Sequence, residues 1–150
     1  MTVDTQVRSA ITPYLVVKDA DAAIAFYTEA FGSEEQYRLT DPHSGKIGHA
    51  DLKIGDAGFM LADEHPDFGA LSPATIGGTA VKLHLAVADA DATVASAERA
   101  GATVLRPVQD QMYGERSGMI ADPFGHQWFI GTPIAEVSPE EMQVRYDDAS

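Results

Sequence analysis

The 150-residue sequence contains no cysteine. This absence excludes a scaffold stapled by disulfides, a metal site built from thiolates and a cysteine nucleophile. No apolar run approaches the roughly 18 residues that a membrane-spanning helix needs. The first eight residues also lack the charged-then-apolar pattern of a secretory signal. From these absences we expect a cytoplasmic protein that does not engage a membrane.

Basic residues are scarce. The chain has 10 Lys and Arg against 23 Asp and Glu, which gives a formal net charge of -13. No basic stripe is present that would neutralise nucleic-acid phosphates, so we expect no nucleic-acid partner. The simplest role of the acidity is solubility, and its functional alternative is the attraction of a cationic ligand. Since 45% of the residues are hydrophobic, the chain has enough apolar side chains for a core.

The sequence contains an internal repeat. The segment VVKDADA at 16–22 matches AVADADA at 86–92, an offset of 86 − 16 = 70. Further along, EAFG at 29–32 faces ERAG at 98–101, at an offset of 98 − 29 = 69. A one-residue deletion in the second copy explains the difference. Two copies of one structural unit are therefore expected.

Each copy is predicted to form a strand, a helix and three further strands. In the first copy, alternating apolar residues at 10–18 predict a strand, and a helix then begins at Asp19 or Asp21 and ends at Gly32. Strands are expected near 34–40, 46–54 and 57–62, and in the second copy near 80–88, 103–109, 113–121 and 126–131, with a helix over 90–100. The fold class is therefore α+β, with two βαβββ modules forming curved mixed sheets around a cleft.

The expected boundaries follow from these elements. Residues 1–9 form an N-terminal extension, 10–62 the first module, 63–79 a linker rich in Pro and Gly, and 80–133 the second module. The remaining residues, 134–150, form an acidic tail with a short helix from Pro139.

Period-two alternation assigns a face to each strand residue. The face covered by the helices is predicted to hold Ile11, Leu15, Val17, Leu52, Ile54, Phe59, Leu61, Leu83, Leu85, Val87, Trp128 and Ile130. The opposite, concave face is the expected ligand-binding surface, with candidate residues Thr12, Tyr14, His49, Asp51, Met60, Lys82, His84, Ser117, Met119 and Phe129. Candidates for a general base are Glu115, His84 and His49.

Several of these residues have structural alternatives. Tyr14 and Phe129 serve equally well as packing residues, and His49 as an exposed strand residue. Lys82 is expected to form an ion pair with Asp51 or with Glu115, within or beside the pocket.

Four residues outside that list are expected to have structural roles. His43 and His65 fall in turns and are expected to face solvent. His126 follows the Asp-Pro-Phe-Gly turn and is expected to serve strand geometry, and Arg116 is expected on the outer surface.

The repeat and its closing motif resemble a known superfamily. The strand-Asp-helix entry at 14–31, its copy at 84–101, and YGERSG at 113–118 followed by DPFGHQW at 122–128 are similar to the vicinal oxygen chelate superfamily. That superfamily includes glyoxalase I, extradiol dioxygenases and bleomycin-resistance proteins, and the last stretch looks most like its PhnB-like branch. The resemblance covers about 10–133. It implies the fold and a C₂ homodimer, often with sites built from both chains, but not the reaction.

The resemblance also implies where a metal would bind. Relatives hold a divalent metal with His or Gln early in the first strand of each module and Glu in each last strand. Those positions here hold Thr12, Lys82, Met60 and Phe129, which do not form a ligand set. His84 lies two residues from Lys82 on the same face, but the last strands still lack a carboxylate partner for it. We therefore expect no metal and no other cofactor.

Two functions remain open from the sequence. The first is a metal-independent protein that binds a small molecule and sequesters a drug or metabolite. The second is a glyoxalase-like lyase or isomerase, or a dioxygenase, that acts on a small carbonyl or aromatic metabolite. Acidic walls with aromatic faces favour a cationic ligand, whereas Lys82 inside the pocket favours an anionic one.

Overall fold

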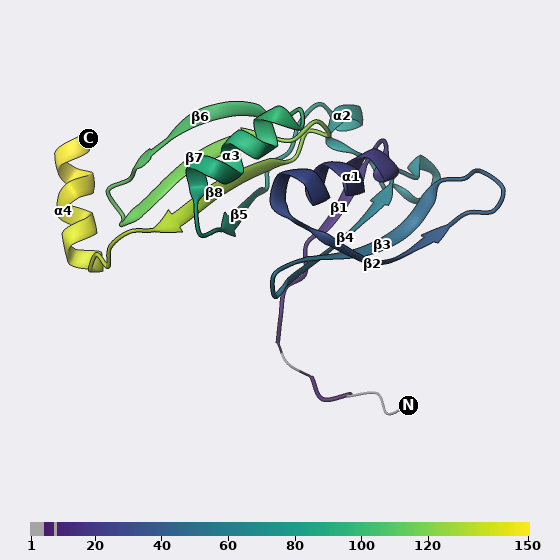
Figure 1. Cartoon of the computed structure of the whole chain (residues 1–150), viewed down its shortest axis with the longest axis horizontal. Helices are drawn as coiled ribbons and strands as arrows, with labels where there is room; N and C mark the ends of the chain where they lie inside the picture. The colour runs from purple at the N-terminus through teal and green to yellow at the C-terminus, as the bar shows by residue number, and fades with distance from the viewer. Residues whose placement is uncertain (1–4, 8) are drawn as a thin grey trace.

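The protein is described from a computed structural model, which covers residues 5–7 and 9–150. Most of the predicted extension at 1–9 therefore lies outside the described residues. The first module contains β1 (Tyr14–Val17), α1 (Ala20–Phe31), β2 (Glu34–Thr40), β3 (Ile47–Ile54) and β4 (Ala57–Asp63). The second contains β5 (Lys82–Ala86), α3 (Ala90–Arg99), β6 (Thr103–Asp110), β7 (Glu115–Ala121) and β8 (Gln127–Pro133). The prediction of two βαβββ modules in an α+β fold is confirmed (Figure 1).

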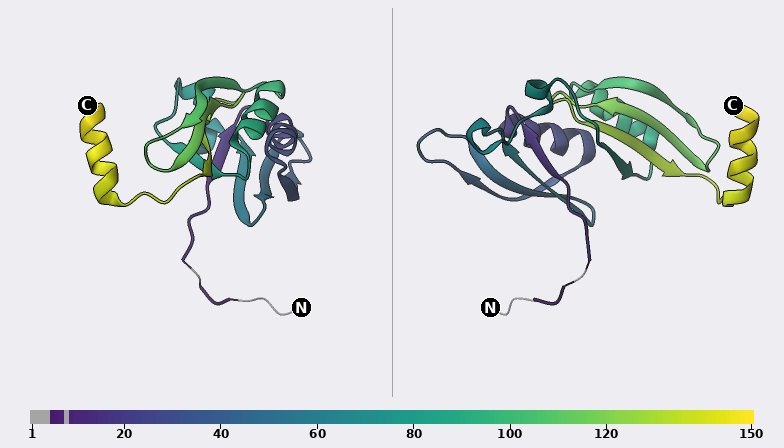
Figure 2. Two further views of the ribbon diagram at one scale, coloured as in Figure 1. Left: turned by 60° about the vertical axis from the view of Figure 1, so that its left-hand side comes forward. Right: turned by 180° about the vertical axis from the view of Figure 1, so that it is seen from behind.

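Each module has the same mixed four-stranded sheet. The strand orders are β1-β4-β3-β2 and β5-β8-β7-β6. The first strand runs parallel to the last, and the remaining pairs are antiparallel. The helix after the first strand crosses one face of its sheet and leaves the other face open (Figure 2).

The helix boundaries follow from local capping chemistry. The side chain of Asp19 accepts a hydrogen bond from the backbone N–H of Ala22 at 3.1 Å, and Asp89 does the same for Ala92 at 3.0 Å. Helix α1 ends at Gly32, which has a φ of 69°. This left-handed conformation suits glycine because it has no Cβ.

The two modules share one core. Helices α1 and α3 pack on each other, and buried residues of both modules belong to one apolar cluster. Trp128 of β8 lies 5.6 Å from Tyr27 and 5.0 Å from Phe31, measured between ring centroids. His126 adds a polar link, since its Nε2 lies 2.9 Å from the backbone oxygen of Val16 in β1. The modules therefore depend on each other for burial.

The entry to β1 differs from the prediction. Strand β1 begins at Tyr14 rather than at residue 10, and Ile11, expected on the covered face, is 97% exposed. Pro13 explains the boundary: it has no N–H for a sheet, although its oxygen still accepts from the Met60 N–H at 2.9 Å. Leu15 and Val17, which follow it, are buried as predicted.

The predicted linker carries short structure of its own. It contains a 3₁₀ turn, η1 (Pro66–Phe68), and a short helix, α2 (Pro73–Ile76). The backbone of His65 bonds to that of Ala70, which closes a compact loop at the end of β4.

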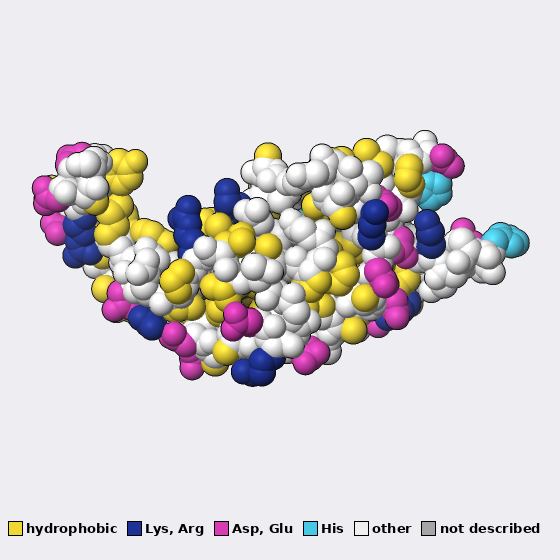
Figure 3. Space-filling model, turned by 90° about the horizontal axis from the view of Figure 1, so that it is seen from above, with side chains coloured by type: hydrophobic (Ala, Val, Ile, Leu, Met, Phe, Trp, Pro, Cys, Tyr) yellow, Lys and Arg dark blue, Asp and Glu magenta, His cyan; other side chains and the backbone are white. Residues whose placement is uncertain are grey.

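The tail forms a helix that stands apart from the body. Helix α4 (Pro139–Ala149) begins at the proline expected from the sequence and has no buried residue. Figure 3 shows hydrophobic side chains on the side of this projecting helix that faces the hollow beside it. Within residues 5–7 and 9–150, no helix is long and apolar enough to cross a membrane.

Candidate functional site

The open face of the first module carries a chain of polar side chains. The Tyr14 hydroxyl lies 2.8 Å from His49 Nδ1, and His49 Nε2 lies 3.0 Å from Asp51 Oδ1. Strand pairing places them: Tyr14 is beside Met60 across β1 and β4, and Asp51 is beside Met60 across β3 and β4. The alternation in the sequence therefore brought four of the candidate residues to one surface.

A second tyrosine borders this group. The Tyr37 and His49 ring centroids are 5.7 Å apart, and Tyr37 pairs with Asp51 across β2 and β3. Burial and the neighbouring Asp51 carboxylate raise the pKa of Tyr14 and also that of Tyr37. Both phenols are therefore neutral at physiological pH.

The open face of the second module carries a histidine–carboxylate pair. His84 Nε2 lies 2.9 and 2.8 Å from the two Glu115 carboxylate oxygens. The Glu115 side chain is 15% exposed and that of His84 is 49% exposed, so the carboxylate lies under the imidazole. Gly131 makes the space, because a Cβ there would meet the Glu115 carboxylate at 2.2 Å.

The expected ion pair of Lys82 is wrong. Lys82 is exposed, and within residues 5–7 and 9–150 no salt bridge joins it to Asp51 or Glu115. Asp51 instead contacts His49 of its own strand and Glu115 contacts His84, which leaves the lysine at the start of β5 exposed. This placement removes the reason for expecting a buried cation there.

The other candidate residues lie in the second sheet or, in the case of Thr12, before β1. Phe129 lies beside both His84 and Met119 across the strands of the second sheet. Ser117 is buried, with its hydroxyl 3.1 Å from that of Tyr113, and Met119 is 7% exposed. Thr12 lies before β1 and lines two smaller hollows, of 390 and 360 Å³, the second of which also contains His84. The ten candidates therefore do not meet in one cavity of a single chain.

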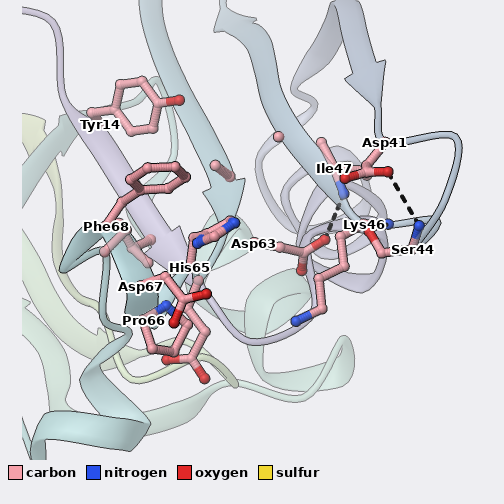
Figure 4. A pocket seen from close by; sticks show the side chains of 15 residues that line it. Tyr14, Asp41, Ser44, Lys46, Ile47, Asp63, His65, Pro66, Asp67 and Phe68 are labelled. Carbon is pink, nitrogen blue, oxygen red and sulfur yellow. Dashed lines mark hydrogen bonds between the residues drawn. The ribbon is translucent and has the colours of Figure 1, made fainter.

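A cavity of ligand size lies at the end of the first module. It has a volume of about 810 Å³ and is bordered by Tyr14, Val16, the β2–β3 turn, the end of β4 and the loop at 64–70. Figure 4 shows Tyr14, Phe68 and His65 along one side, with Asp41, Ser44 and Lys46 on the other. Phe68 is 84% exposed, and its ring centroid lies 4.4 Å from that of His65.

The lining of this cavity is acidic and well ordered by hydrogen bonds. Asp63 accepts from the backbone N–H of Ala20 and of Ile47, at 2.8 and 2.7 Å. Hydrogen bonds from the backbone of His43 and Ser44 hold the pKa of Asp41 below its usual value. Glu64 receives bonds from Thr75 and Ser72, which lower its pKa in the same way. Asp41 and Glu64 therefore stay negatively charged, and Lys46 lines the same cavity as a cation.

The residues do not fit the metal site that the superfamily implies. Met60 and Phe129, two of the expected ligand positions, lie beside Tyr14 and His84 rather than beside Thr12 and Lys82. A phenylalanine offers no donor, and a thioether is a soft one. Within the described part of the chain, no group of three or more His, Asp or Glu is placed to hold a metal ion.

Sequence reasoning missed the cavity loop. His65 is exposed, as predicted, but it also lines the 810 Å³ cavity together with Phe68, for which the sequence provided no expectation. Strand alternation could not find them, since they lie in a turn. A phenylalanine inside a turn, between Pro66 and Gly69, is the one signal that the sequence offers.

Comparisons with known proteins agree with this fold. The family model described as Glyoxalase/Bleomycin resistance protein/Dioxygenase superfamily matches residues 8–130. An uncharacterized protein of Mycobacterium tuberculosis is 43% identical over 145 residues, which is 95% of this chain and 85% of that protein. An uncharacterized protein of Arabidopsis thaliana is 28% identical over 130 residues, covering 81% of this chain and 76% of that protein.

Solved structures extend the comparison. TioX from Micromonospora sp. ML1 is 26% identical with a TM-score of 0.66, covering 85% of this chain and 100% of that one. The fosfomycin resistance protein FosX from Listeria monocytogenes is 17% identical with a TM-score of 0.66, covering 91% and 99%. The likeness to FosX concerns the fold alone.

Proposed function

Since this chain belongs to the glyoxalase/bleomycin resistance protein/dioxygenase superfamily, we propose that it is a metal-independent binding protein for a small organic molecule, which it sequesters in the cytoplasm. The observation that carries the proposal is the cavity of about 810 Å³ at the end of the first module. Its size is that of a site for a drug-sized ligand.

The lining selects the ligand's chemistry. The carboxylates of Asp41, Asp63, Glu64 and Asp67 outnumber the single ammonium of Lys46. Phe68 presents an exposed ring at the rim, and an aromatic face attracts a cation by about 0.5–2 kcal/mol. A flat molecule with a positive charge therefore suits this cavity better than an anion.

We further propose that two copies associate as a C₂ homodimer. One copy leaves the open faces of its two sheets apart, and it leaves α4 without a buried residue. On α4, Val144 is 53% and Tyr146 61% exposed. A second copy that covers α4 and brings one first-module face against one second-module face would bury these surfaces.

The test uses a matched pair of probes. N-methylquinolinium and quinoline have nearly the same ring system and differ in a fixed positive charge. We expect wild type to bind N-methylquinolinium more tightly by roughly two- to thirtyfold, the range given by a cation–π contact. Phe68→Ala and Asp67→Asn should each reduce that preference, whereas Asp148→Asn on α4 should not. Equal affinity for the two probes, or a preference that survives Phe68→Ala, contradicts the assignment.

Metal independence has its own test. Elemental analysis of protein purified without chelator should find no stoichiometric Ni, Zn, Fe or Mn. One metal ion per chain would overturn this part of the proposal.

A further inference from the structure

The chain of Tyr14, His49 and Asp51 has a defined proton order. A carboxylate can only accept, so His49 Nε2, at 3.0 Å from Asp51 Oδ1, carries a hydrogen. In the neutral imidazole, Nδ1 is then an acceptor, and the Tyr14 hydroxyl at 2.8 Å donates to it. The phenol proton therefore points at a base, and the tyrosine oxygen keeps its lone pairs for a bound molecule.

We propose that Tyr14, His49 and Asp51 form a proton relay that removes a proton from a carbon acid bound in the 810 Å³ cavity. The substrate's proton passes to the Tyr14 oxygen as the tyrosine's own proton passes to His49 Nδ1. A substrate that carries a positive charge beside the acidic carbon, as the cavity lining favours, keeps the C–H electron pair and becomes neutral overall, and the imidazole becomes an imidazolium paired with Asp51. Net charge is conserved, and return of the proton to the same or a neighbouring carbon completes an epimerisation or isomerisation. No oxidant, metal or co-reactant is required.

The exposure of the side chains indicates which residue of the relay contacts the substrate. Tyr14 is 46% exposed and lines the cavity, whereas the His49 side chain is 22% exposed and does not. A molecule in the cavity therefore meets the phenol first. His49 is in turn held between Tyr14 and Asp51, and its ring lies 5.4 Å from that of Tyr14. Asp51 holds the imidazole in the productive tautomer, which is a positioning role.

The ionisation state of the phenol agrees with this role. Burial and Asp51 raise the pKa of Tyr14, so the resting tyrosine is neutral and donates to His49. A bare phenolate would instead lose this bond. The relay supplies basicity through the imidazole without requiring ionised tyrosine at rest.

The second module does not repeat the arrangement. The position equivalent to Tyr14, 70 residues on, is His84, which presents its imidazole directly and lies on Glu115. His84 borders a hollow of 360 Å³ rather than the large cavity. The combination of a phenol relay and a cavity of ligand size is therefore specific to the first module.

The test uses 5-nitrobenzisoxazole, a compact carbon acid. When a base takes its ring C–H proton, the C–H electron pair becomes the third bond of a nitrile, the N–O bond breaks and the oxygen leaves as a coloured phenolate. Wild type should accelerate this opening. Tyr14→Phe and His49→Gln should each lower kcat at least about tenfold, the lower part of the range for general-base catalysis. Tyr146→Phe on α4 is the matched control and should keep the wild-type rate.

A second readout tests the relay without turnover. Nitrogen NMR of the His49 ring should show hydrogen on Nε2, with the Nδ1 signal changing in Tyr14→Phe. Hydrogen on Nδ1 in the neutral ring, or a wild-type rate equal to that of Tyr14→Phe, overturns the relay. The relay shares its cavity with the proposed binding function, but the two fail separately. N-methylquinolinium binding tests the cavity, and the Tyr14-dependent rate tests the relay.

Discussion

The hydroxyl of Tyr27 in the first module donates a hydrogen bond of 2.5 Å to the carboxylate of Asp122 in the second. The two residues are 0% and 4% exposed. Asp122 also accepts from Trp128 Nε1 at 3.0 Å and from the backbone of Phe124 and His126 at 2.9 and 3.0 Å. Asp122 therefore stabilises its own Asp-Pro-Phe-Gly turn and also links that turn to α1.

Removing this link should weaken the shared core. Tyr27→Phe should lower the free energy of unfolding by about 1.5–3 kcal/mol, the contribution of a hydrogen bond to a charged group. Asp122→Ala should cost more, about 3–5 kcal/mol, because the hydroxyl, the indole N–H and two backbone N–H groups lose their acceptor. Urea unfolding measures both values. A Tyr27→Phe variant as stable as wild type would show that the bond contributes nothing net.

The same bond predicts a limit at high pH. Burial, followed by the charge of Asp122, raises the pKa of Tyr27 well above its usual value. A tyrosine whose pKa is raised in the folded state stabilises the fold fully below the unfolded pKa of about 10, and that contribution is lost as pH rises further. The stability difference between wild type and Tyr27→Phe should be constant from pH 7 to 9. Above pH 10 it should fall by about 1.4 kcal/mol per pH unit. A difference that stays flat to pH 11 would contradict the assignment.

Two glycines in the second sheet should respond differently to alanine. At Gly131 the new Cβ meets the Glu115 carboxylate, which can move, whereas at Gly118 it meets the backbone oxygen of Arg106 at 2.9 Å. Gly118→Ala should therefore destabilise by about 1–3 kcal/mol, as overpacking does. Gly131→Ala should be milder but should separate His84 from Glu115, which NMR of the His84 ring detects. Equal destabilisation by the two variants would argue against a mobile Glu115.

Deleting α4 should separate folding from assembly. The helix has no buried residue. Arg145 Nη1 donates a hydrogen bond of 2.6 Å to the backbone oxygen of Met112 in the second module. A chain ending at residue 137 should keep its circular dichroism spectrum but sediment as a monomer, whereas the full chain should sediment as a dimer at micromolar concentration. A truncated chain that remains dimeric would place the interface elsewhere.

Lys82 offers a test of the alternative, anionic ligand. The exposed side chain has no salt bridge to Asp51 or Glu115, so Lys82→Met should change the unfolding free energy by less than about 0.5 kcal/mol. If an anion were the true ligand and bound at Lys82, its affinity would fall by about 1.5–3 kcal/mol in the variant. Calorimetry with benzoate as the probe separates these outcomes, and we expect no change for benzoate.

The two modules and most of their strand faces can be predicted from the amino-acid sequence. The offset of 70 between the two copies, the capping residues Asp19 and Asp89, and the period-two strands are local features. Such features can be predicted from the sequence because each depends on residues that are neighbours along the chain. The strand ends were predicted less well. Pro13 has no backbone N–H to donate, and β1 begins after it, at Tyr14. Ile11 is therefore exposed rather than part of the core.

The contacts between the polar side chains depend on the three-dimensional packing. The sequence placed Tyr14, His49 and Asp51 on one face, but the order of their hydrogen bonds depends on the β3–β4–β1 register. The same limit applies to Lys82, whose expected partners were taken by His49 and His84, and to Phe68, which reaches the cavity through a turn. These contacts join residues far apart in the chain, and their geometry is set by packing between strands and loops, for which a single sequence carries no local signal.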